Sequence, residues 1–144
     1  MAISSAICNS FKQEILVEGH NFTNGTDQFK LALYTSSASL GASTTAYSAT
    51  NEISNASGSA YSAGGANLTS VTPALDGSTA VCDFADISFT SASFTANGCL
   101  IYNSTNSNKA VCVVAFGGDK TVSSGTFTIQ FPAAAASTAI VRIA

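Results

Sequence analysis

The stretch KAVCVVAFGGDKTVSSGTFTIQFP, residues 109–132, carries both patterns that decide the fold. Its first part, Ala110–Phe116, is the most apolar run of the chain and ends at a pair of glycines. A short apolar run bounded by a turn signal predicts a central strand that is covered on both faces. Its last part, GTFTIQFP, alternates Phe and Ile with Thr and Gln and closes with a proline, which predicts a half-buried strand. The sequence therefore predicts two strands, with the glycine pair ending the first.

Similar short strands are expected on the N-terminal and C-terminal sides of this stretch. Turn signals such as Asp76-Gly77 separate them. Pro73 lacks a backbone N–H and suits a strand end or a sheet edge, and Asn97-Gly98 indicates a bulge. The additional strands are predicted at Phe29–Tyr34, Ala66–Thr72, Thr79–Phe84, Ile87–Thr90, Phe94–Tyr102 and Thr138–Ala144. About eight short strands at such intervals favour an all-β sandwich or barrel over a fold in which strands alternate with helices.

The N-terminal residues are the one candidate for a helix. Ile7, Phe11 and Ile15 recur every four residues and would form one apolar stripe. We expect a helix over residues 4–18, capped by a serine at its start and ended by Gly19 in a left-handed conformation.

The 144 residues suit a single hydrophobic core. We predict a helical arm at residues 1–22 and a single β-sandwich domain at residues 23–144. Residues 36–60 are mostly small and polar, which predicts a long loop anchored by Tyr47 and Ile53. Loops of this length in compact domains often form interfaces or functional sites.

The chain carries little charge. Charged residues make up 9% of the sequence, against about 25% in a typical soluble domain, and the net charge is −3. The five cations are scattered, so the sequence does not predict nucleic-acid binding. Two interpretations fit the low charge: an extracellular type of β protein with a Ser/Thr-rich surface, or a surface largely covered by neighbouring molecules.

The sequence indicates folding in a cytoplasm. No apolar run approaches the roughly 20 residues of a membrane-spanning helix. Lys12 and Glu14 interrupt the apolar positions at the start of the chain, which is unlike a signal peptide. A cytoplasmic origin favours free thiols. The cysteines are Cys8, Cys82, Cys99 and Cys112, and none stands in the paired spacing of a zinc ribbon.

No set of catalytic residues, cofactor-binding motif or metal motif stands out. His20 is the single histidine and is expected at the surface or just after the helix. Asp83 and Asp86 could lie close enough to hold a calcium ion or to act as a pair of catalytic acids, but satisfying turn amides is the commoner role of such aspartates. The sequence GGDK at residues 117–120 lacks the spacing of a phosphate-binding loop. We therefore expect no enzymatic activity and no cofactor.

Three long stretches resemble a family of small virion proteins from tailed bacteriophages. They are SSAICNSFKQEILVEGHNFTNGTDQFKLALYTSSASLGASTTAYSATNEIS (4–54), YSAGGANLTSVTPALDGSTAVCDFADISF (61–89) and FTANGCLIYNSTNSNKAVCVVAFGGDKTVSSGTFTIQFP (94–132). The last is similar to that family's pattern of LIYN, KAV, FGGDK and a final FT–FP. Members with an associated role resemble capsid decoration (cement) proteins of jelly-roll or β-sandwich fold. The resemblance implies an antiparallel jelly-roll-like β-sandwich of about eight strands with a short N-terminal helix.

The resemblance also implies a structural role in the virion. The expected partners are the major capsid protein and further copies of this chain, in a trimer, with no nucleic acid and no membrane. The alternative is a tail or fibre-tip module that recognises a glycan on the host surface. The residues expected at an interface are Ile7, Phe11, Ile15, Tyr47, Ile53 and Tyr61.

Overall fold

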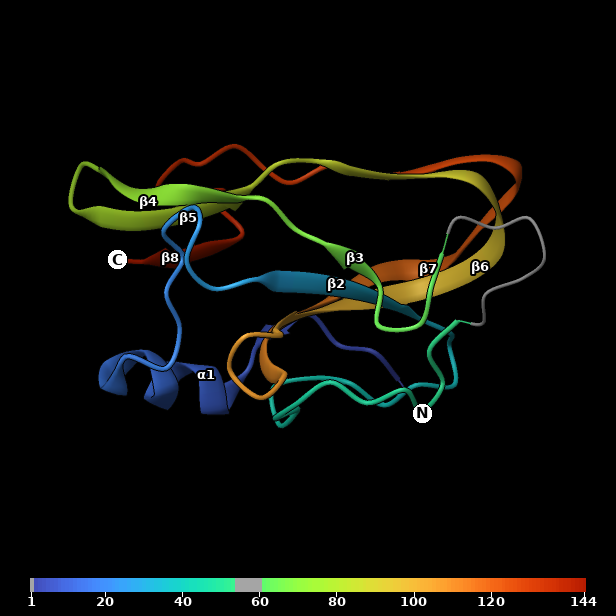
Figure 1. The fold of residues 1–144 in the computed structure, drawn as a ribbon, viewed down its shortest axis with the longest axis horizontal. Coiled ribbons are helices and arrows are strands. Elements are labelled where there is room, and N and C mark those ends of the chain that lie inside the picture. Colours follow the sequence, from blue (N-terminus) through green and yellow to red (C-terminus); the bar gives the residue numbers. More distant parts are fainter. Residues whose placement is uncertain (1, 54–60) are drawn as a thin grey trace.

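The computed structural model describes residues 2–53 and 61–144 and shows a mostly β protein with two antiparallel sheets. Figure 1 shows the sheets along the length of the molecule, with the helical segment at one end. The helical elements are α1 (Asn9–Glu14) and the 3-10 turn η1 (Ile15–Val17). The strands are β1 (Ala6–Ile7), β2 (Phe29–Tyr34), β3 (Ala66–Asn67), β4 (Ser70–Asp76), β5 (Thr79–Phe84), β6 (Ile87–Asn103), β7 (Lys109–Ile129) and β8 (Val141–Ile143).

One sheet has five strands in the order β1-β7-β6-β2-β3, and the other has three in the order β4-β5-β8. All described pairings between these strands are antiparallel. The all-β expectation with a short N-terminal helix is confirmed at this level. The strand expected at Thr79–Phe84 is found at those residues, and so is the strand at Phe29–Tyr34.

A long hairpin of β6 and β7 dominates the five-stranded sheet. The sequence predicts two strands on each side of this hairpin, but the structure joins them into single strands of 17 and 21 residues. Gly117 and Gly118 adopt positive φ values and bend β7 rather than ending it. The ladder shifts register at four places, including the expected bulge between Ala96 and Gly98. These irregularities let the hairpin fold back over itself, as the course of β6 and β7 in Figure 1 shows.

Pro73 lies on a sheet edge, as its missing N–H suggests. The single strand expected at Ala66–Thr72 is divided between the two sheets, as β3 and β4. β4 continues through Pro73 to Asp76, and its pairing with β5 shifts register between Val71 and Ala74. The chain can pass through the proline because β4 has a partner on one side only.

The N-terminal helix is shorter than the sequence pattern suggests. Its first predicted turns instead contain β1, where Ile7 pairs with Cys112 of β7. The expected serine cap is wrong, because Cys8 occupies the N-cap position without a side-chain hydrogen bond. The expected left-handed Gly19 is also wrong: Glu18 takes that conformation, with φ 59°, and the N–H of Gly19 donates to the carbonyl oxygen of Glu14 at 2.7 Å. Pairing with an edge of the sheet has overridden the helical period.

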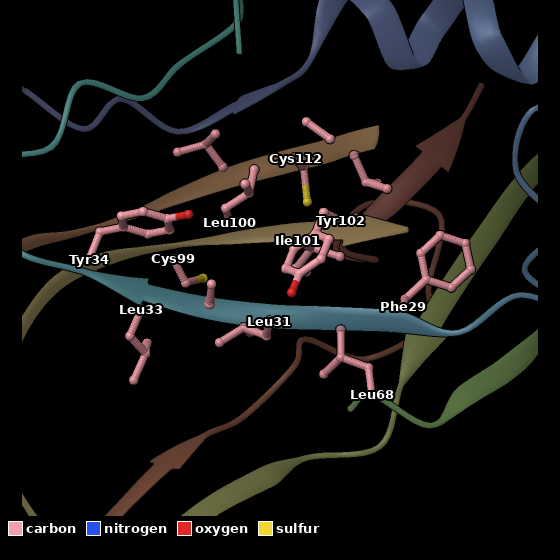
Figure 2. Close-up of a cluster of buried hydrophobic side chains, with 14 of the residues drawn as sticks. Phe29, Leu31, Leu33, Tyr34, Leu68, Cys99, Leu100, Ile101, Tyr102 and Cys112 are labelled. Atoms are coloured by element: carbon pink, nitrogen blue, oxygen red, sulfur yellow. The ribbon is translucent and has the colours of Figure 1, made fainter. Parts of the chain in front are cut away.

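The core lies against β2, β6 and β7. Figure 2 shows apolar side chains from β2 and β6 gathered with Cys112 of β7. Alternate residues of β2 meet residues of β6 directly across the ladder, for example Leu31 opposite Ile101 and Leu33 opposite Cys99. Both faces of β2 are covered, since Leu31, Ala32, Leu33 and Tyr34 are all buried. The four cysteines are free thiols, as expected, and all but Cys82 are buried.

Candidate functional site

An apolar groove runs between α1 and the three-stranded sheet. Its volume is about 190 Å³. Side chains from both elements and from the intervening chain line it: Phe11, Ile15, His20, Phe22, Pro73, Ala80, Cys82, Val141, Arg142 and Ile143. We call this feature the helix groove. Figure 1 shows α1 at the same end of the molecule as β4, β5 and β8.

Large apolar side chains are exposed around the helix groove. Leu75, Ala80 and Ile143 pair across β4, β5 and β8, so their side chains share the face that lines the groove. Leu75 is 74% exposed and Ile143 is 55% exposed. Leu16 and Val17 directly follow Ile15 of the groove and are 83% and 64% exposed. Of these four residues, Ile143 lines the groove, Leu75 pairs with the lining residue Ala80, and Leu16 and Val17 follow the lining residue Ile15 along the chain.

Val71 is the other large apolar side chain that stands exposed in the described part of the chain. It pairs with Asp83, which points to the opposite face of β5 from Ala80 and Cys82. Four of the five exposed large apolar residues of the described chain therefore line the helix groove or neighbour a residue that does, and the fifth provides a comparison on the other face of the same sheet.

The six residues expected at an interface fall into different environments. Phe11 and Ile15 line the helix groove, with Phe11 buried and Ile15 half-buried. Ile7 is half-buried in β1. The other three, Tyr47, Ile53 and Tyr61, hold the loop after β2 against the core, and Ile53 and Tyr61 are fully inside it. The sequence does not single out Leu75 or Ile143, because an apolar residue in a strand is expected in the core, and only the assembled sheet shows that these two side chains are exposed.

A half-buried carboxylate organises the loop after β2. Glu52 accepts hydrogen bonds from the hydroxyl of Tyr47 at 2.6 Å, from the hydroxyl of Tyr61, and from the backbone N–H of Gly64 at 2.8 Å. Tyr61 also accepts a hydrogen bond from the N–H of Leu33 in β2 at 3.0 Å. Glu52 thus ties the loop to β2, which confirms the anchoring role expected of Tyr47.

All four tyrosines belong to this cluster. Tyr47 stacks on Tyr102 with ring centroids 4.7 Å apart, and Tyr34 donates to the carbonyl oxygen of Ser48 at 2.7 Å. Burial, together with the charge of Glu52, raises the pKa of Tyr102 to about 12 and raises the pKa values of the other three tyrosines as well. They are neutral hydrogen-bond donors at ordinary pH, held inside the chain rather than presented as a platform for a sugar.

His20 lies in a second polar cluster. Of its two expected places, at the surface or just after the helix, the structure shows the second, and the ring is not at the surface. Its side chain is fully buried, with Nε2 2.9 Å from Oε1 of Glu14, while Nζ of Lys109 lies 3.9 Å from the other oxygen. Nδ1 lies 3.1 Å from Nδ2 of Asn103. The turn after η1 brings the ring between the helix and the hairpin, a contact that sequence spacing does not reveal.

Asn103 fixes the tautomer of His20. Its Oδ1 accepts from the N–H groups of Thr105 and Asn106, at 3.1 and 3.2 Å, and its Nδ2 donates to Oδ2 of Asp27 at 2.8 Å. The amide nitrogen therefore faces Nδ1, which must be an acceptor. It follows that Nε2 carries the ring hydrogen and donates a hydrogen bond to Oε1 of Glu14.

This geometry favours a structural role for His20 over catalysis. Cys82 also lines the helix groove, but both ring nitrogens of His20 are already engaged by Glu14 and Asn103. Burial raises the pKa of the Cys82 thiol to about 11, so it is protonated at neutral pH and a weak nucleophile.

The two aspartates considered as a metal or acid pair serve backbone amides. Asp83 accepts from the N–H of Phe84 at 2.8 Å, and Asp86 accepts from the N–H of Phe131 at 2.8 Å. Within residues 2–53 and 61–144, no three His, Cys, Asp or Glu side chains come together as a metal site would require. None of the helices in the described part of the chain has the length and apolar character needed to cross a membrane.

Comparisons with known proteins identify no similar protein. No protein-family model, curated protein or solved structure matches the chain. The candidate site that we take forward is the helix groove with the exposed apolar residues in and beside it.

Proposed function

We propose that this chain is a bacteriophage capsid decoration, or cement, protein that binds the assembled shell of major capsid protein and stabilises it through oligomeric contacts. The resemblance of residues 4–54, 61–89 and 94–132 to small virion proteins supports the class of protein. The observation that supports the mode of action is that the exposed residues Leu16, Val17, Leu75 and Ile143 line the helix groove or neighbour residues that do.

Exposed apolar residues are common when scattered, but a continuous patch usually marks a protein contact. Burying such a patch against another molecule gains about 25 cal/mol per Å² of apolar surface removed from water. The low charge of the chain also lowers the desolvation penalty when its surface is covered. In a shell, weak contacts of this kind add up, because each copy is held by several neighbours at once.

In this proposal the two sheets form a jelly-roll-like sandwich that acts as a rigid spacer. The helix groove is the surface that meets the major capsid protein or another copy, in an assembly that we expect to be trimeric. The chain would be made in the host bacterial cytoplasm and end on the outside of the capsid.

The glycan-binding alternative receives less support. A sugar site usually presents aromatic rings to solvent, and the chain has no tryptophan. Its four tyrosines hold the loop after β2 inside the molecule. We therefore favour the capsid over the tail tip.

The first test of the role is the number of copies per virion, measured by quantitative mass spectrometry of purified particles. A cement protein should be present in hundreds of copies, in a simple ratio to the major capsid protein. A handful of copies would indicate a protein of the tail and would favour the glycan-binding alternative. Absence from particles would refute both hypotheses.

The second test addresses the surface. The double variant Leu75→Asp/Ile143→Asp should lose binding to shells that lack this protein by at least about tenfold, because it places charges in the apolar contact. Val71→Asp, on the other face of the same sheet, is the matched control and should bind normally. Equal binding by the two variants, with both folded by circular dichroism, would show that the helix groove is not the contact.

A further inference from the structure

A second and larger apolar space lies where β7 bends back on itself. Val114 and Phe116, from the first half of β7, face Phe127 and Ile129 from the second half, and Ile140 closes one side. The ring centroids of Phe116 and Phe127 are 6.2 Å apart. We call this space, of about 560 Å³, the β7 pocket. It shares no lining residue with the helix groove.

The large apolar side chains that line the β7 pocket are only half-buried. All five residues named above keep part of their surface accessible, because the pocket is empty of protein. The volume is within the range of about 300–1,000 Å³ that is typical of small-molecule sites. It is several times the volume of about 150 Å³ that admits benzene in an engineered apolar cavity. An apolar molecule of moderate length therefore fits here.

One cation stands in this apolar lining. Lys120 is the only charged residue among the lining side chains, and the other polar ones are Thr128 and Gln130. Within the described residues Lys120 forms no ion pair, and the neighbouring Asp119 is engaged by the side-chain amide of Asn97 at 2.9 Å. A ligand with an anionic group would find a free partner, whereas a cationic ligand would meet a like charge.

We propose that the β7 pocket binds a free amphipathic carboxylate, with its hydrocarbon chain between the two halves of β7 and its carboxylate at Lys120. The apolar walls supply most of the binding free energy through removal of surface from water. Lys120, being exposed, contributes direction and selectivity for the sign of charge more than affinity. This inference goes beyond the proposed capsid role and does not depend on it.

The test uses dodecanoate below its micellar concentration as the probe. Calorimetric titration of the full chain should show saturable binding, and NMR should show contacts between the acyl chain and the methyl groups of Val114, Ile129 and Ile140. Lys120→Gln should weaken binding about tenfold. Lys12→Gln, which removes an exposed lysine on α1, is the matched control and should leave binding unchanged. Dodecyltrimethylammonium should bind more weakly than dodecanoate.

A second variant tests the pocket itself. Val114→Phe adds volume into open space, so it should abolish binding while leaving the melting temperature within a few degrees. Absence of saturable binding to the native chain, or equal binding of the anionic and cationic probes, would overturn the proposal. So would sedimentation data showing that the β7 pocket is closed by a second copy, with Val114→Phe dissociating that oligomer.

Discussion

Gly65 illustrates how strongly a single residue is fixed by its surroundings. It has φ 85°, a conformation that side chains rarely adopt. A Cβ atom on Gly65 would overlap the carbonyl oxygen of Leu31, because the segment entering β3 passes directly over β2. Two separate constraints, backbone conformation and close approach, thus demand glycine at this position.

Replacing Gly65 with alanine should therefore destabilise the fold by more than about 3 kcal/mol, measured by urea unfolding. Gly77→Ala is the matched control: Gly77 also has a positive φ, of 63°, but nothing lies within 4 Å of the added atom. It should cost only about 1 kcal/mol. Similar losses in the two variants would mean that the overlap at Leu31 is relieved by a small backbone shift.

At this scale the sequence predicts some partners and misses others. Tyr47 and Ile53 were predictable as anchors, because large apolar residues in a polar loop seek the core. His20 was not, because its partner Asn103 lies 83 residues away. Glu52 was not either, although Tyr47 and Tyr61 lie only 5 and 9 residues from it, because no local pattern shows that the loop folds back to bring both hydroxyls to one carboxylate.

Among the elements, the helical segment formed by α1 and η1 has a buried part and an exposed part. Phe11 of α1 is buried against Phe22 and His20, with ring centroids 5.9 and 4.9 Å away. Leu16, in the 3-10 turn η1, is largely exposed. The helix is too short to be stable alone, so its packing holds it in place.

Phe11→Ala should lower the free energy of unfolding by about 3–5 kcal/mol, because it leaves a cavity at the base of the helix. Leu16→Ala should change it by no more than about 0.5 kcal/mol, since that side chain contributes little to the folded monomer. Chemical denaturation of both variants gives the comparison. A large loss for Leu16→Ala would show that the exposed end of the helix is already covered in solution.

The elements also show where local sequence patterns reach their limit. The apolar and alternating runs locate the strands, but the glycine pair at 117–118 and the polar break between Thr90 and Phe94 predict strand ends that the structure does not have. In β6 and β7 the hairpin ladder continues through those breaks by shifting register, so long-range pairing decides the strand length. The same pairing draws Ala6–Ile7 into a strand despite a helical period.

For the molecule as a whole, buried ionisable groups predict sensitivity to alkali. Burial raises the pKa of Cys8 and Cys82 to about 11 and that of Cys99 to about 12, and all four tyrosines have raised pKa values. Each group is neutral in its protonated form. As the pH rises above about 9, the unfolded chain releases these protons before the folded chain does. Ionisation therefore stabilises the unfolded state more than the folded state.

The free energy of unfolding should accordingly be insensitive to these groups below about pH 8 and should fall steadily between about pH 9 and pH 12. Urea unfolding at a series of pH values measures this. Tyrosine absorbance at 295 nm should rise together with loss of structure rather than before it. Ionisation of two or more tyrosines in the intact fold near pH 10 would contradict the cluster around Glu52.

The gathering of all four tyrosines has a consequence for spectroscopy. Without tryptophan, every ultraviolet fluorophore of practical strength in this chain lies near one carboxylate, within hydrogen bonds or ring contacts of the same loop. A carboxylate that accepts a hydrogen bond from the phenol hydroxyl quenches tyrosine emission, so the folded protein should fluoresce weakly. The intensity of tyrosine fluorescence then reports on this loop alone. An increase in intensity indicates that the loop after β2 has separated from β2, even when the sheets remain intact.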